Sequence, residues 1–281
     1  MIKIVTVVKD DLEGLKRTAK SIEGQTLQVS WIIVTPPIDS EMFEYISMLV
    51  MKGTVSRVIS DKGIGVYPAM NDTINNLSQS DWVWFLNAGD EFGSKESYEK
   101  MMLVVRSSSH QWIYGGHYLI SAEGKLLGQV KSPSSFKAEQ QLFARRYVSH
   151  QSTIFAVKIL LHLKGFDTRY KIASDWDLLV RASRVDPGER TEELISRFHM
   201  GGLSTLNRQL GNKELFRIRQ INLQKKYCLK NYYWFYYRAF RNYFVLLLES
   251  RYPKEVNIIR KFRLSIKTLS RQVTSKFNGS L

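Results

Sequence analysis

Two aspartates beside predicted secondary-structure boundaries are the first candidates for chemistry. Asp90 ends the segment Asn87-Ala88-Gly89-Asp90, which follows an apolar stretch at residues 82–86. A carboxylate in this place could hold a divalent cation, which in turn could bind a diphosphate. The same segment is also typical of a turn that leads into a helix near Ser94. Its spacing alone favours the turn.

Asp175 stands at the predicted start of a helix, with Asp177 two residues later. A carboxylate there could act as a general base that takes a proton from an attacking hydroxyl. An aspartate at a helix N-terminus more often caps the helix, which stabilises it by about 1 kcal/mol. Position alone therefore favours the cap.

A glycine-containing segment and two histidines are weaker candidates. Gly63 and Gly65 precede a predicted helix, where backbone N–H groups can approach a phosphate, but the spacing matches neither a dinucleotide fingerprint nor a P-loop. His150 and His199 lie in predicted loops and could contact a metal or a phosphate. A lone histidine is more often packed or hydrogen-bonded. No zinc motif and no Ser/His/Asp order is present.

The elements that must position these residues alternate between strand and helix through the first ~110 residues. Apolar or alternating runs predict strands at residues 2–8, 31–35, 55–59 and 82–86, with amphipathic helices between them. The pattern predicts an α/β doubly wound, mostly parallel sheet with right-handed crossovers. Ligands bind such sheets outside the carboxyl ends of the strands. The loops expected at the site are therefore 8–11, 35–40, 60–67 and 87–93.

The remainder of the chain has a different pattern. Residues 114–130 predict a hairpin that turns at 123–125, and a helix is expected near 172–184. The start of the chain reads as a strand and not as a secretory signal, and no uncharged apolar run approaches the ~18–20 residues that span a bilayer. Cys228 is the single cysteine, so internal disulfides and cysteine metal clusters are excluded.

The charge is concentrated at the C-terminal end. The net charge is +15, yet residues 207–281 hold 17 of the 41 basic residues and 3 of the 26 acidic ones. Such a tail suits a polyanion, either nucleic acid or an anionic membrane surface, or else a solvated helical face. Its aromatic and basic residues fall on different sides of a predicted helix near 232–248. This pattern suits binding to a membrane surface, and it suits equally an aromatic face packed against the catalytic domain or a partner subunit.

Six segments occur in an order that can be compared with known families. They are residues 4–8 with Thr18, Ser21 and Gln25; 65–71; 85–90; 150–155; 165–167 with 173–178 and Arg181; and 201–204. Together they resemble the family 2 glycosyltransferases of the GT-A fold, especially bacterial enzymes that build exopolysaccharide or O-antigen. The resemblance covers about residues 3–204. It implies a GT-A domain at 1–206 and a basic, aromatic-rich helical extension at 207–281.

The resemblance also implies a reaction. The chain is expected to be an inverting, metal-dependent enzyme that moves a sugar from a nucleotide diphosphate donor to an acceptor hydroxyl. Asp175 matches the catalytic base, and Asp90 matches the carboxylate that binds Mg²⁺ or Mn²⁺, with His150 or His199 as a further candidate ligand. The acceptor is expected to be a lipid-linked saccharide, met by a cytoplasmic protein at the inner face of the membrane through its C-terminal extension. No nucleic acid is expected as a partner.

The same resemblance assigns the donor-binding residues. Thr6 and Val8 would line the nucleotide site, and Asp61 would contact the base. The remaining candidates for the sugar and diphosphate end of the donor are Asn71, Asn87 and Arg181.

Departures from the family pattern keep other interpretations open. The metal motif is reduced to one firm carboxylate, Asp90, and the segment after the second strand begins Thr35-Pro36-Pro37 where an aspartate is usual. A non-catalytic relative that binds a nucleotide is therefore one alternative. A polyanion-binding or nucleic-acid-binding protein is another, although it leaves Asp90 and Asp175 without a role. A sugar nucleotidyltransferase lacks support, because residues 9–14 do not carry its glycine-rich signature.

Overall fold

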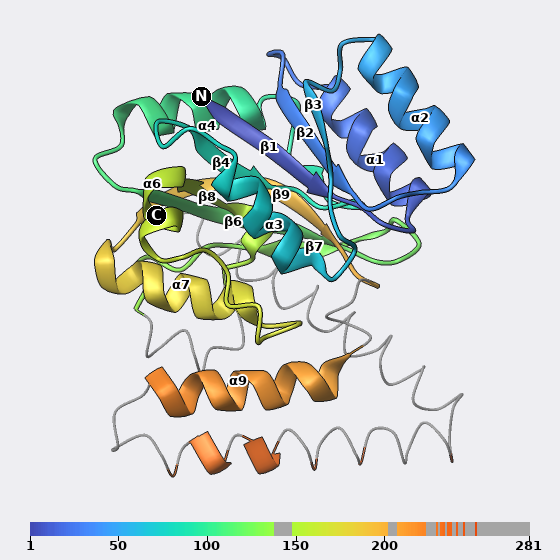
Figure 1. The fold of residues 1–281 in the computed structure, drawn as a ribbon. Coiled ribbons are helices and arrows are strands. Elements are labelled where there is room, and N and C mark those ends of the chain that lie inside the picture. The colour runs from blue at the N-terminus through green and yellow to red at the C-terminus, as the bar shows by residue number, and fades with distance from the viewer. Residues whose placement is uncertain are drawn as a thin grey trace, which may run out of the picture. The chain divides into compact units, whose positions relative to one another are not determined.

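The computed structural model describes residues 1–137, 148–201 and 207–222, together with residues 229, 231–233, 235–237, 240, 244 and 251 (Figure 1). The chain separates into two compact units, Met1–Ile218 and Arg219–Leu281. The predicted boundary at residue 206 stays a prediction. The segment 202–204, which contributed to the family resemblance, lies outside the described residues.

A nine-stranded mixed sheet forms the centre of the described part of the first unit. Its order is β3-β2-β1-β4-β8-β6-β9-β5, and β7 pairs with β6. The strands are β1 (Ile2–Val7), β2 (Ser30–Thr35), β3 (Arg57–Ser60), β4 (Trp82–Phe85), β5 (Glu91–Phe92), β6 (Trp112–Ile120), β7 (Leu126–Val130), β8 (Thr153–Ala156) and β9 (Glu189–His199).

The strands pair in two different ways. β3, β2, β1 and β4 are parallel neighbours, as their alternation with helices predicts. β8 joins β4 antiparallel and β6 joins β8 antiparallel, while β6 and β9 are parallel to each other. The predicted α/β class is confirmed. The predicted hairpin is confirmed as well, because β6 and β7 are antiparallel around a turn at residues 121–125.

Helices cover both faces of the sheet (Figure 1). One apolar core contains Ile4 from β1 with Leu15, Met42 and Met101 from α1, α2 and α4. Val5, the next residue of β1, joins the opposite core with residues of α3, α6 and α7, because successive strand side chains point to opposite faces. The helices are α1 (Leu12–Glu23), α2 (Ser40–Met51), α3 (Val66–Asn75), α4 (Ser97–Ser107), α6 (Val157–His162), α7 (Ser174–Val185) and α9 (Arg208–Asn222), with a short 3₁₀ turn at His150–Ser152.

One predicted boundary is shifted. The third strand begins at Arg57, two residues later than its apolar run, because Val55 packs in the core before the strand pairs with β2. α2 follows Asp39, whose carboxylate caps the helix by accepting the Met42 N–H at 2.9 Å. In the described part of the chain, every helix is too short or too polar to cross a membrane.

Candidate active site

Helix α1 holds the segment that carries Asp90. The Thr18 hydroxyl donates to the Asp90 carbonyl at 2.7 Å and accepts the Gly89 N–H at 3.1 Å. One turn further along α1, Ser21 accepts the N–H of Phe92. Gly89 takes a φ of +92°, which favours glycine, so the segment forms the turn that its composition predicts. The turn and a functional role therefore coexist, because the turn fixes Asp90 at the carboxyl end of β4.

Asp90 is almost fully enclosed, with 6% of its surface exposed. Burial raises the pKa of its carboxyl group from 3.8 to about 6, although the nearby charge of His150, a hydrogen bond from Gln151 and the proximity of His199 oppose this shift. A carboxyl group in this state binds a proton or a cation more readily than an exposed one, since a positive partner compensates its lost hydration.

A chain of contacts runs from the segment after β4 to the first turn of α7. The Asn87 amide nitrogen lies 3.3 Å from Nε2 of His150, and Nδ1 of His150 lies 3.2 Å from Oδ2 of Asp175. A neutral imidazole with its proton on Nδ1 satisfies both contacts, because it accepts from Asn87 and donates to Asp175. Loop residues predicted separately are therefore brought together here.

Both aspartates also raise the pKa of His150. Burial lowers the pKa of His150, but the hydrogen bond and charge of Asp175 and the charge of Asp90 outweigh it, so the pKa lies above its ordinary 6.5. The imidazole is thus placed between the carboxylate predicted to bind metal and the one predicted to act as base.

Asp175 has a second neighbour in Tyr67. The phenol lies 3.4 Å from Oδ1 of Asp175 and donates to the Ile172 carbonyl at 2.9 Å. Burial raises the pKa of Tyr67 well above its ordinary range, so the phenol keeps its proton and remains a donor. Tyr67 received no role from the sequence, although it lies within the segment 65–71 that contributed to the family resemblance.

Capping does not explain Asp175. The N-cap of α7 is Ala173, and its side chain cannot form a capping hydrogen bond. The Asp175 carboxylate accepts only its neighbour's N–H, from Trp176, among the backbone contacts found in the described residues. Asp177 is committed elsewhere, because it binds Arg181 at 2.7 Å. Asp175 therefore presents its carboxylate at the N-terminal end of a helix, which is the positive end of the helix dipole.

Two predicted donor-binding residues hold a loop through their side chains. The Asn71 amide donates to the Phe166 carbonyl and accepts the Phe166 N–H, both at 2.8 Å. Arg181 donates to the carbonyls of Leu163 and Gly165 at 2.7 and 2.8 Å. A Cβ on Gly165, which has a φ of +65°, would lie 2.2 Å from Oδ1 of Asn71. The polar groups of Asn71 and Arg181 are therefore used within the protein.

The other predicted donor-binding residues lie at strand ends. Thr6 is fully buried, and its hydroxyl donates to Leu86 and accepts from the Trp31 indole. Val8 follows β1, and Asp61 follows β3. The Asp61 carboxylate accepts the Gly63 N–H at 2.8 Å, which orders the loop before α3. Only Val8 and Asp61 of these three therefore stand at the carboxyl edge of the sheet, as residues of a nucleotide site would.

His199 lies near Asp90, at the end of β9. Its Nε2 is 3.4 Å from a carboxylate oxygen of Glu91. The His199 contact, followed by the charges of Arg197 and Arg17, lowers the pKa of Glu91 although burial opposes the shift. Glu91 and Gln151 are neighbours of Asp90 that the sequence analysis missed. Both directly follow a predicted residue, Asp90 or His150, and that adjacency was the available signal.

Two side chains, Asn87 and Asp90, could offer oxygen ligands to a metal ion at this site. Oδ1 of Asn87 is buried without a hydrogen-bond partner, and the Asp90 carboxylate lies three residues on. Within the described residues, no group of three or more His, Cys, Asp or Glu side chains is placed to hold a metal. A carboxylate with an amide oxygen suits Mg²⁺ or Mn²⁺ when substrate phosphates and water complete the shell. The chemical type of these two ligands therefore fits Mg²⁺ or Mn²⁺.

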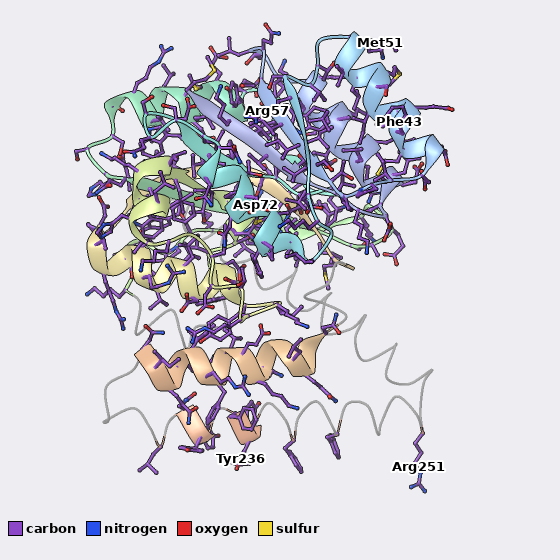
Figure 2. The ribbon with its side chains drawn as sticks, viewed as in Figure 1. Phe43, Met51, Arg57, Asp72, Tyr236 and Arg251 are labelled. Carbon is purple, nitrogen blue, oxygen red and sulfur yellow. The ribbon has the colours of Figure 1, made fainter. Side chains whose placement is uncertain are left out.

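A hollow of about 570 Å³ lies along α2 beside the ends of β2 and β3, where Thr35, Pro36 and Ser60 contribute to its lining. Phe43 and Met51 line it as well and are 63% and 81% exposed (Figure 2). The residues around His150 do not line it.

Comparison with known proteins identifies the architecture. No family model matches the sequence. Two Mycobacterium tuberculosis proteins, from strains CDC 1551 and H37Rv, are named as uncharacterized glycosyltransferases and are each 25% identical over 189 residues, covering 66% of this chain and 69% of theirs.

Solved structures show the same architecture. S. aureus TarS 1–349 in complex with UDP matches with a TM-score of 0.62 at 10% identity, over 85% of this chain and 72% of that one. The mannosyltransferase PcManGT from Pyrobaculum calidifontis, in complex with GDP-Man and Mn²⁺, matches with a TM-score of 0.60 at 9% identity, over 98% and 83%. The chain has a GT-A-type fold, and the fold that the sequence resemblance implies is confirmed.

Proposed function

We propose that this chain, with its GT-A-type fold, is a family 2 glycosyltransferase that transfers a sugar from a nucleoside diphosphate donor to an acceptor hydroxyl with inversion. The observation that carries the proposal is the chain Asn87–His150–Asp175, which joins the segment of the candidate metal ligand to the candidate base. The names of the mycobacterial relatives and the nucleotides bound by TarS and PcManGT support a nucleotide-sugar donor.

Asp175 acts as the general base in this reaction. As the acceptor oxygen bonds to the anomeric carbon, its proton passes to the Asp175 carboxylate, and the bond from that carbon to the β-phosphate oxygen breaks. The nucleoside diphosphate leaves with the electron pair of the broken bond. Attack from the face opposite the leaving group makes this a single displacement that inverts the anomeric configuration.

His150 and Tyr67 orient this base. His150 can donate to Oδ2 of Asp175, while the Tyr67 phenol, whose single proton goes to the Ile172 carbonyl, lies 3.4 Å from Oδ1. The two contacts restrict the orientation of the carboxylate. The 16% exposure of its side chain leaves Asp175 accessible to an acceptor. The contacts of His150 and Tyr67 restrict rotation of the Asp175 carboxylate before the acceptor binds. This restriction raises the rate by positioning the base.

Asp90 and Oδ1 of Asn87 would hold the divalent cation, with His150 and His199 close enough to act on the charge of Asp90. When bound, Mg²⁺ or Mn²⁺ stabilises the charge that develops on the leaving diphosphate. Asp90 supplies the full negative charge of the set. Asn87 also contacts His150, so the same side chain would link the donor end of the site to the base.

For the donor nucleotide, Val8 and Asp61 are the candidates best placed at the carboxyl edge of the sheet, with Asp61 at the base. Thr6 contributes by fixing the backbone between β1 and β4, since its hydroxyl is already bonded. Asn71 and Arg181 contribute indirectly to the donor site, because their side chains bind the backbone of the loop 163–166.

The acceptor we propose is a lipid-linked saccharide in cell-surface polysaccharide synthesis, presented at the inner face of the cytoplasmic membrane. The support is the charge of residues 207–281 and the exposed aromatic side chains there. Tyr233 stacks on Tyr237, and Phe240 stacks on Phe244. The described aromatic residues of this segment with large exposed fractions are Tyr232, Tyr233, Tyr236, Tyr237, Phe240 and Phe244. Arg238 and Arg241, on which the amphipathic prediction also depends, lie outside the described residues.

A donor screen tests the proposed function. The full chain is incubated with UDP-, GDP- and dTDP-sugars, with Mg²⁺ or Mn²⁺ or with excess chelator, and release of the nucleoside diphosphate is measured. We expect release with one base in the presence of metal, and an inverted anomeric configuration in the product by NMR. Binding of a nucleotide without turnover, over a range of saccharide and lipid-linked acceptors, would favour the non-catalytic relative, which the single carboxylate of the metal motif also suits.

A further inference from the structure

Glu214 in α9 makes a set of contacts that the proposed chemistry has not used. Its carboxylate accepts the backbone N–H groups of Lys171, Ile172 and Ala173, at 2.8, 2.9 and 2.9 Å. Only 4% of Glu214 is exposed. A buried carboxylate is stable only when its charge is compensated, and three N–H donors beside a helix N-terminus supply that compensation.

The three residues held by Glu214 lead directly into Ser174 and Asp175. Tyr67 binds the same short segment from its carbonyl side, through the oxygen of Ile172. Glu214 thus holds the N–H groups and Tyr67 holds a carbonyl group of the residues just before the candidate base. The backbone that carries Asp175 is fixed on both sides, and Tyr67 also reaches the Asp175 carboxylate.

Glu214 also replaces a cap that α7 lacks. The N-cap position is Ala173, which has no side-chain acceptor, so its N–H is satisfied by a carboxylate 41 residues later in the chain. α9 approaches this segment closely at Gly211, where an added Cβ would lie 3.2 Å from the Ile172 side chain. The contact lies within the unit Met1–Ile218, and it brings α9 into the construction of the site.

We propose that Glu214 is a positioning residue for Asp175: by fixing residues 171–173, it sets where the base stands relative to His150 and the acceptor. The proposal rests on the proposed function, in which Asp175 takes the acceptor proton. It extends the catalytic machinery into α9, beyond the segments that resemble the family. Displacing a catalytic group by about 1 Å can slow a reaction by on the order of 100-fold, so the contact is expected to control the rate more than donor affinity.

Two substitutions of Glu214 test this. Glu214→Gln keeps the shape but presents an amide N–H₂ to backbone donors, and Glu214→Asp keeps the charge but is one methylene too short to reach all three N–H groups. Lys213→Ala is the matched control, because Lys213 is exposed on the same helix. The measurements are kcat per folded molecule, acceptor KM, binding of UDP and GDP with Mn²⁺, the pH profile of kcat, and amide hydrogen exchange at residues 171–175.

For both Glu214 variants we expect kcat to fall by on the order of 10- to 100-fold, while the Kd of the nucleoside diphosphate stays within about twofold of wild type. The acidic limb of the kcat profile should move, because the contact between Asp175 and His150 changes, and the amides of Ile172 and Ala173 should exchange faster. Lys213→Ala should match wild type in each measurement.

A merely structural cap would give a different result. Faster exchange and a lower Tm with wild-type kcat and an unmoved pH profile would overturn the positioning role. If Glu214→Gln does not fold, Glu214→Asp decides by the same measurements. A wild-type chain that binds nucleotide but transfers no sugar would contradict the proposed function instead, and the positioning role would fall with it even where the exchange data still show that Glu214 holds the loop.

Discussion

Nδ1 of His150 lies 3.2 Å from Oδ2 of Asp175, and the pair joins the 3₁₀ turn before β8 to the first turn of α7. Both side chains are mostly enclosed, at 18% and 16% exposure. Burial lowers the pKa of His150, but the hydrogen bond and charge of Asp175 and the charge of Asp90 raise it above its ordinary 6.5. The protonation of His150 therefore depends on the charge of the candidate base.

Replacing Asp175 with asparagine should nearly abolish transfer while nucleotide binding survives. The change removes the proton acceptor but preserves the side-chain shape, so it removes a transition-state role and little ground-state binding. We expect kcat to fall by about 10²–10⁴-fold, the usual contribution of a general base. Steady-state kinetics and calorimetric binding of the nucleoside diphosphate measure the two effects. Asp72→Asn, on the exposed side of α3, is the control (Figure 2). Wild-type turnover in Asp175→Asn would remove Asp175 from the mechanism.

His150→Gln should move the acidic limb of the kcat profile to lower pH. In wild type, as the pH falls through the raised pKa of His150, the imidazole becomes a cation and its Nε2 can no longer accept from Asn87. Glutamine does not titrate, so the profile should lose the step that belongs to His150 and the limb should lie at lower pH. His162→Gln, at an exposed position, should leave the limb in place. A limb at the wild-type pH in His150→Gln would show that another group controls it.

The same substitution should affect stability with a definite sign. The pKa of His150 is raised in the folded protein above its ordinary 6.5, so the contact with Asp175 stabilises the fold fully below about pH 6.5. That contribution is lost as the pH rises through the raised pKa. The difference in unfolding free energy between wild type and His150→Gln, from urea titrations, should therefore be largest in acid and shrink toward alkaline pH. A difference that grows with pH would contradict this electrostatic account.

The sequence predicted this site unevenly, and the reason is physical. Asp90 and Asp175 were assigned through the family resemblance, because position alone favours a turn for the first and a helix cap for the second. Thr18, Ser21 and Gln25 fitted the family pattern, and the structure shows that they hold residues 87–98 through hydrogen bonds.

Contacts between residues far apart in the sequence could not be predicted from local sequence patterns. Glu214 binds N–H groups 41 to 43 residues earlier, and a single glutamate on a basic helix carries no sign of such a partner. The side chains of Asn71 and Arg181 likewise bind backbone in the loop 163–166, a contact that only tertiary structure reveals.

Asp90→Asn should stabilise the protein at neutral pH while impairing its use of metal. The folded protein raises the pKa of Asp90 from 3.8 to about 6, so the group favours folding below about pH 3.8, and this contribution is lost as the pH rises through about 6. In chelator at pH 8, the neutral asparagine should raise the unfolding free energy by on the order of 2–3 kcal/mol, with little difference near pH 4.

Asp90→Asn should also impair the metal-dependent reaction. Asp90 supplies the only full negative charge proposed for the cation, so Asp90→Asn should need far more Mg²⁺ or Mn²⁺ for the same rate. Urea unfolding in chelator and metal titrations of activity measure the two halves, again with Asp72→Asn as control. Full activity of wild type in excess chelator would refute the metal role. A less stable Asp90→Asn at pH 8 would refute the account of its buried charge.

The C-terminal segment should bind anionic membrane surfaces. Tyr236 and Phe240 are exposed at helical i, i+4 spacing, and residues 207–281 carry 17 basic and 3 acidic residues. Aromatic rings favour the headgroup boundary, and each Lys or Arg near an anionic surface contributes about 1 kcal/mol. We expect full-length protein to sediment with phosphatidylserine-containing liposomes at low salt and to be released as salt rises, with weak binding to neutral phosphatidylcholine liposomes.

Full-length variants separate the two contributions. Arg238→Gln with Arg241→Gln should weaken binding by on the order of tenfold and reduce its salt dependence, whereas Tyr236→Ser with Phe240→Ser should weaken binding at all salt concentrations. A truncation for the same purpose should end after Asn222, because ending at residue 206 would also remove Glu214 and release the loop before Asp175. If full-length protein ignores anionic liposomes at low salt, the aromatic face must instead pack against protein, and chain association measured by sedimentation equilibrium becomes the expected consequence.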